Sequence, residues 1–133
     1  MSFEERAKKL VENFRKKSDE SAALYNEFLK LLQEIIAGVD LNLQFPVTLY
    51  TYSSDKFVFS IRYDGIRLKA EFDVDYFHGP TAIEEAILDF LNKLDDITKD
   101  MERRIKKFRS DYEKLKIIVE RLKFARKMLG VLK

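Results

Sequence analysis

Two carboxylates and the only imidazole of the chain fall close together after a predicted strand. They are Asp73, Asp75 and His78. Asp73 and Asp75 share one face of that strand, and carboxylate and imidazole groups are ligands for divalent metals. Their spacing matches no metal motif, and hydrated acids at a strand end explain it equally well. We therefore predict no metal site and no cofactor, and we rank a metal-dependent enzyme last of three hypotheses.

The sequence shows no recognisable arrangement for nucleophilic catalysis. The chain has no cysteine, and neither Ser53 nor Ser54 lies in a Gly-x-Ser-x-Gly pattern. The four glycines are scattered along the chain, which excludes a glycine-rich phosphate loop. We predict that the protein is not an enzyme and has no small-molecule substrate.

Positive charge is concentrated in the last third of the chain. Residues 99–133 carry thirteen basic and five acidic side chains, a net charge of +8, whereas the whole chain carries +2. A basic helix can lie along the phosphates of a nucleic acid, with an affinity that falls as salt rises. The contacts under this alternative hypothesis are Arg103, Arg104, Lys106, Lys107 and Arg109. Acidic residues are interleaved with the basic ones, as on any hydrated helix surface, so nucleic-acid binding is our second hypothesis.

One long helix, over residues 81–130, is expected to carry these basic side chains. Apolar residues recur every seven positions from Ile87 to Leu129, and a second set follows the first at a spacing of four. This 4-3 spacing is the heptad pattern of a helix that packs lengthwise on another helix. Thr81 begins an S/T-x-x-E capping box. We predict one continuous helix and leave open a break near Asp95–Asp96.

A first helix is predicted over residues 2–37. Ser2 begins another capping box, Gly38 is a natural stop, and the apolar positions again follow heptads. We predict that this helix pairs antiparallel with the long helix as a coiled coil, which places Phe3 near Val131.

Between the helices the apolar period changes from 3.5 to 2, which indicates strands. Asp64-Gly65 is a strong signal for a two-residue hairpin turn, and such a turn pairs Tyr63 with Ile66. The preceding strand is expected to place Tyr52 beside Phe57. The result is a three-stranded antiparallel meander with one apolar face, which the start of the long helix would cover.

A second apolar stripe lies on the C-terminal helix, away from its heptad seam. Its members are Ile117, Phe124, Met128 and Val131. One helical hairpin cannot bury both faces, and an exposed apolar patch usually marks an interface. We predict that this stripe joins two copies in a homodimer; the alternative is that the ends of the hairpin cover it.

Composition indicates a folded, helix-rich protein, because 46% of the residues are hydrophobic and 36% are charged. Met1 leads into a charged amphipathic segment without a signal-peptide core, and no apolar run could span a membrane. We predict a cytoplasmic protein with no membrane association. Abundant Lys and Glu with little Gln and no Cys resemble a thermophile composition.

These elements together predict one α+β domain over residues 1–133. It is a long antiparallel helical hairpin, a coiled coil, with a three-stranded antiparallel β-meander inserted between its two helices; the ranges are 2–37, 45–74 and 81–130. In outline this arrangement is similar to a prefoldin chaperone subunit. Our first functional hypothesis is a non-catalytic, self-associating adaptor that binds another macromolecule. A small viral or plasmid-borne inhibitor or a chaperone-like module would fit it.

Overall fold

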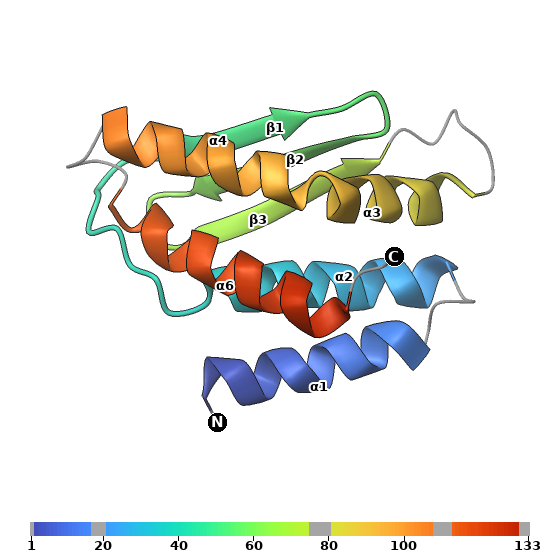
Figure 1. The fold of residues 1–133 in the computed structure, drawn as a ribbon. Helices are drawn as coiled ribbons and strands as arrows, with labels where there is room; N and C mark the ends of the chain where they lie inside the picture. The colour runs from blue at the N-terminus through green and yellow to red at the C-terminus, as the bar shows by residue number, and fades with distance from the viewer. Residues whose placement is uncertain (1, 17–20, 75–80, 108–112, 131–133) are drawn as a thin grey trace.

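A computed structural model describes residues 2–16, 21–74, 81–107 and 113–130 of the chain. Five helices and a three-stranded antiparallel sheet lie within these ranges (Figure 1). In chain order the elements are α1 (Phe3–Lys16), α2 (Ser21–Ile36), β1 (Val47–Ser53), β2 (Phe57–Tyr63), β3 (Leu68–Val74), α3 (Ala82–Asn92), α4 (Leu94–Lys107) and α6 (Leu115–Leu129). The predicted α+β class and the antiparallel sheet are confirmed.

The helices cover one face of the sheet, and α1 lies farthest from it (Figure 1). Strand side chains alternate between buried and more exposed positions, as expected for a sheet with one covered face. Five aromatic rings meet where α2 and α3 pack on the sheet: Phe28, Phe57, Phe59, Phe72 and Phe90. This aromatic cluster joins the helical layer to the sheet.

The predicted helix over residues 2–37 is wrong, because the structure divides it into α1 and α2. The two run antiparallel to each other, as the 2.6 Å ion pair between Arg6 Nε and Glu34 Oε1 shows. The residues between them, 17–20, lie outside the described ranges, and their sequence Lys-Ser-Asp-Glu offers no apolar side chain to a seam. The terminal signals are confirmed: Ser2 Oγ accepts from the Glu5 N–H, and Gly38 has a positive φ after the end of α2.

The continuous helix over residues 81–130 is also wrong. A bend at Lys93, near the break that was left open, separates α3 from α4. α6 then returns antiparallel along α4, with Lys123 3.1 Å from Glu102 and Arg126 paired with Asp95. The heptads persist because α4 and α6 bury their seams against each other. A heptad pattern specifies which face is buried, and a reversal of the chain leaves that face unchanged.

The predicted coiled coil between the first and last helices is therefore contradicted. α1 and α6 run parallel rather than antiparallel (Figure 1). Phe3 packs on Phe124 with ring centroids 6.0 Å apart, and Arg15 donates to the Met128 carbonyl at 2.8 Å. The sheet is not inserted between two helices, so the similarity in outline to a prefoldin subunit is lost.

Within the described helices, no stretch has both the length and the apolar character needed to cross a membrane.

The strands pair as predicted, but the register of each pair is shifted by two residues. Tyr63 lies opposite Leu68 rather than Ile66, and Tyr52 lies opposite Phe59 rather than Phe57. A shift of two keeps every side chain on its face, so the apolar pattern cannot distinguish these registers. β1 also contains a bulge between Thr48 and Tyr50. At this bulge the β1 side chains stop alternating regularly between buried and exposed positions.

Candidate interaction site

The predicted dimer stripe lies partly against α1. Phe124 contacts Phe3, and Met128 is half-buried, whereas Ile117 is exposed. Val131 lies outside the described residues. The N-terminal helix thus covers part of the stripe, which was the alternative considered for it. Self-association through this stripe stays a prediction.

Four of the basic residues proposed for nucleic-acid binding lie near the C-terminal end of α4. Arg103 and Arg104 both pair with Asp100, at 3.5 and 3.7 Å, and the Arg104 guanidinium lies over the Tyr50 ring. Lys106 and Lys107 are exposed, and Arg109 lies outside the described residues. Arg103 and Arg104 therefore have an acidic partner on their own helix, and nucleic-acid binding stays a prediction.

The acidic set considered for a metal is only partly described. Asp73 is exposed on the open face of the sheet, whereas Asp75 and His78 lie outside the described ranges. Among the described residues no three acidic, histidine or cysteine side chains cluster as metal ligands.

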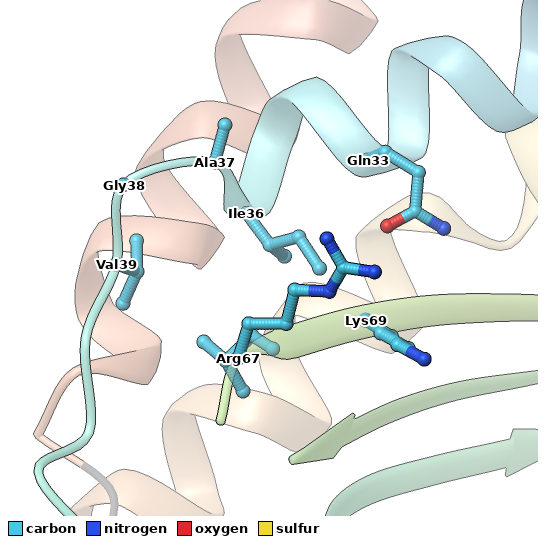
Figure 2. Close-up of a pocket in the computed structure, with 8 residues that line it drawn as sticks. Gln33, Ile36, Ala37, Gly38, Val39, Arg67 and Lys69 are labelled. Carbon is cyan, nitrogen blue, oxygen red and sulfur yellow. The ribbon is translucent and has the colours of Figure 1, made fainter. Parts of the chain in front are cut away.

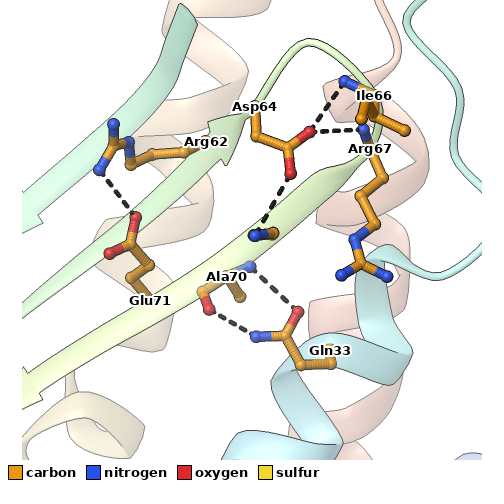
Figure 3. A network of polar contacts seen from close by, with 8 residues as sticks. Gln33, Arg62, Asp64, Ile66, Arg67, Ala70 and Glu71 are labelled. Atoms are coloured by element: carbon orange, nitrogen blue, oxygen red, sulfur yellow. Dashed lines mark hydrogen bonds and ion pairs between the residues drawn. The ribbon is translucent and has the colours of Figure 1, made fainter. Parts of the chain in front are cut away.

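The turn between β2 and β3 is built around the side chain of Asp64. Its Oδ1 accepts the N–H groups of Ile66 and Arg67, both at 2.8 Å, and its Oδ2 lies 3.3 Å from Lys69 Nζ (Figure 3). A carboxylate with two main-chain donors closes an Asx-type turn, and Gly65 supplies the positive φ that the turn needs. The two-residue loop that was predicted becomes a four-residue one for this reason.

The Asp64 carboxylate makes the turn sensitive to acid. Hydrogen bonds from the Arg67 N–H, then the Ile66 N–H and Lys69, lower the pKa of Asp64 from 3.8 to about 2. Because the folded-state pKa lies below the unfolded value, this group stabilises the fold above about pH 4 and loses that effect as pH falls toward 2. We expect Asp64→Asn to lower the urea midpoint at neutral pH and to approach the wild type in acid. Asp40→Asn, in the exposed loop after α2, is the control; an Asp64 difference that is constant with pH would contradict the prediction.

A cleft lies between the end of α2 and the start of β3. It has a volume of about 520 Å³, and Ile36, Val39 and Leu68 form its apolar floor (Figure 2). Arg67 and Lys69 stand at its mouth, and both side chains are exposed. The cleft thus combines a buried apolar surface with two cations from the loop and strand that Asp64 organises.

Gln33 on α2 marks the boundary of this cleft on β3. Its side-chain amide donates to the Ala70 carbonyl at 2.5 Å and accepts from the Ala70 N–H at 3.2 Å (Figure 3). About two turns earlier on α2, the Tyr25 hydroxyl donates to the Phe72 carbonyl on the same edge of β3. Side chains of α2 therefore occupy the outer edge of β3 at Ala70 and Phe72. Among the described residues, none bonds to the main chain of Leu68 on this edge.

The negative C-terminal end of α2 is neutralised by Arg121 of α6, which does not line the cleft. Arg121 Nη1 donates to the carbonyls of Ile35, at 3.0 Å, and Ala37, at 2.7 Å. The carbonyls of Glu34 and Ile36 accept the N–H groups of Ala37 and Val39. A helix C-terminus normally disfavours a nearby anion. The Arg121 guanidinium offsets that effect here.

Exposed apolar side chains gather at the same end of the sheet. Ile66 in the β2–β3 turn is 84% exposed, and Phe45 before β1 is 58% exposed. Their neighbours in sequence, Gly65 and Pro46, lie close together: a Cβ placed on Gly65 would be 3.9 Å from the Pro46 ring. Phe45, Pro46 and Ile66 therefore form one apolar tip beside the start of β1, of the kind that marks docking surfaces.

The outer edge of β1 is the second uncovered feature. The sheet order β1-β2-β3 makes β1 an edge strand, and within the described ranges no other segment hydrogen-bonds along that edge. Its sequence, Val-Thr-Leu-Tyr-Thr-Tyr-Ser, contains no charge and no proline. Natural edge strands usually carry such residues to prevent pairing with other chains.

Comparison with protein-family models, with curated proteins and with solved structures finds no match. The cleft, the apolar tip and the β1 edge are the surface features that bear on function.

Proposed function

We propose that the protein is a non-catalytic interaction protein that self-associates through the outer edge of β1 and binds another macromolecule at the end of its sheet. The observation that carries the proposal is an uncharged edge strand that no described segment covers. The regular part of the strand, from Tyr50 to Ser53, pairs with β2 without interruption and is long enough to accept a second strand.

A second copy of the same chain is the occupant that fits this edge best. Two β1 strands related by a two-fold axis pair antiparallel, because each presents the same surface to the other. The pairing turns two three-stranded sheets into one six-stranded sheet. Uncharged Thr51 and Tyr52 lie near the axis, where charged side chains of the same sign would repel each other.

The solution mass tests the site of self-association. We expect light scattering to give about twice the chain mass of 15.8 kDa for the wild type. Thr51→Lys should give a monomer, because it places two ammonium groups across the axis. Ser60→Lys is the matched control: it adds the same charge to the same sheet face, on the central strand, and should stay dimeric.

Three results would contradict the proposal. A monomeric wild type removes self-association altogether. A Thr51→Lys protein that stays dimeric while Ile117→Lys becomes monomeric moves the interface to the stripe on α6. Salt-sensitive uptake of a DNA or RNA duplex, lost when Arg103, Lys106 and Lys107 are changed to Glu, replaces the proposal with nucleic-acid binding.

A further inference from the structure

The main chain of Leu68 faces the cleft with its hydrogen-bonding groups available. Both main-chain groups of Ala70 point away from β2 toward Gln33, and the two-residue period of a strand directs those of Leu68 the same way. In the part of the chain that the structure describes, no group bonds to them on that side. One N–H and one C=O of the same residue at a strand edge match the C=O and N–H of one residue in an extended chain.

The cations at the mouth of the cleft select for negative charge. Among the described residues no acidic side chain pairs with Arg67, and its guanidinium extends across the cleft toward α2 (Figure 2). Lys69 on the adjoining strand pairs with Asp64, which leaves a net charge of +1 for the three side chains. An arginine fork binds a carboxylate through two parallel hydrogen bonds, which makes Arg67 the principal anchor.

The floor of the cleft selects for an apolar group beside that charge. Ile36, Val39 and Leu68 are buried, and the cleft volume of about 520 Å³ falls within the range of ordinary ligand sites. Gly38 forms an open wall: no atom lies within 4 Å of the position that a Cβ would take there. An aliphatic side chain has room to enter.

From these three features we propose that the cleft binds the C-terminal end of a partner polypeptide. The terminal carboxylate lies on Arg67 and Lys69, the N–H and C=O of the penultimate residue pair with the Leu68 main chain, and an aliphatic final side chain packs on Ile36 and Val39. A fatty acid would satisfy the cations and the floor but would leave the Leu68 groups unpaired, and inorganic phosphate would leave the floor unfilled. A chain end uses all three.

The proposed function requires a partner macromolecule, and this inference, which rests on that function, specifies the class of partner. It involves the β3 edge, whereas self-association involves the β1 edge on the opposite side of the sheet. Loss of the dimer in Thr51→Lys would therefore leave peptide binding unchanged, and the two ideas can fail separately.

Titration with short N-acetylated peptides that end in leucine tests the proposal. Calorimetry on the full chain should detect binding of the peptide with a free carboxylate. The peptide with a C-terminal amide should bind at least about tenfold more weakly, because it loses the charge-assisted pair with Arg67. Arg67→Gln should weaken the free peptide by a similar factor, and Lys69→Gln by less.

Two controls make the result specific. Arg103→Gln removes an exposed arginine on α4 that does not line the cleft, and it should bind like the wild type. Hexanoate supplies a carboxylate on an aliphatic stem without a peptide group and should bind more weakly than the peptide. Equal affinity for the amide, equal affinity for hexanoate, or no detectable binding of the free peptide would each overturn the proposal.

Discussion

Replacing Phe90 with alanine is expected to lower the free energy of unfolding by about 3–5 kcal/mol, the usual cost of deleting a buried aromatic ring. Phe90 is 1% exposed, and it is the ring on which both layers meet. Its centroid lies between 5.0 and 5.6 Å from those of Phe28, Phe57, Phe59 and Phe72. These neighbours belong to α2 and to two strands, and they cannot collapse into the vacated space together.

The loss should be visible in urea unfolding monitored by circular dichroism. Leu88→Ala on the same helix is the matched control, because Leu88 is half exposed and its removal opens no internal cavity. We expect the control to change stability by less than about 1 kcal/mol. Because natural domains are stable by only about 5–15 kcal/mol, the loss from Phe90→Ala is a large share of the total. A cost comparable to that of Leu88→Ala would show that the aromatic cluster is not the centre of the core.

The sequence predicted the faces of the elements better than their lengths. Heptad spacing from Ile87 to Leu129 identified the buried side of three helices, and the alternation in the strands identified the covered face of the sheet. Neither the heptad spacing nor the two-residue alternation indicates where the chain reverses direction. The reversal between α4 and α6 and the division of the first helix are set by tertiary packing, which the local pattern does not contain.

The register of the hairpins illustrates the same limit at smaller scale. Asp64-Gly65 correctly located the turn, but the Asp64 carboxylate accepts two main-chain N–H groups and widens the loop to four residues. Ile66 consequently becomes the most exposed large apolar side chain among the described residues, rather than a partner of Tyr63. An aspartate that can form an Asx-type turn was the available signal for this outcome.

Most of the candidate site could not be located from the sequence. Gln33, Gly38 and Arg67 come from segments about thirty residues apart, and no motif connects them. Phe45 fell within the predicted meander, over residues 45–74, and nothing in its sequence context indicated that it would be exposed beside the start of β1. Only the uncharged composition of Val47–Ser53 was readable in advance as an edge strand without protection.

Arg121→Ala is expected to be the second most damaging substitution, because this side chain joins three helices. From α6 its guanidinium donates to two carbonyls at the end of α2 and lies 4.6 Å from the ring centroid of Phe3 on α1. Hydrogen bonds to a charged donor contribute about 1.5–3 kcal/mol each, and a cation–π contact adds about 0.5–1. Since water can reach part of the site, we expect a loss of about 2–4 kcal/mol in urea unfolding.

Lysine at this position separates the geometric effect from the effect of charge. Arg121→Lys keeps the positive charge near the end of α2, but an ammonium group lacks the planar fork that serves two carbonyls and stacks on a ring. We expect it to recover less than half of the loss, whereas Arg103→Ala on exposed α4 should be nearly neutral. Full recovery by lysine would mean that charge at the helix end, and not the hydrogen-bond geometry, stabilises the junction. Because the same guanidinium offsets the negative end of α2 behind the cleft, Arg121→Ala should also weaken peptide binding even though Arg121 does not line the cleft.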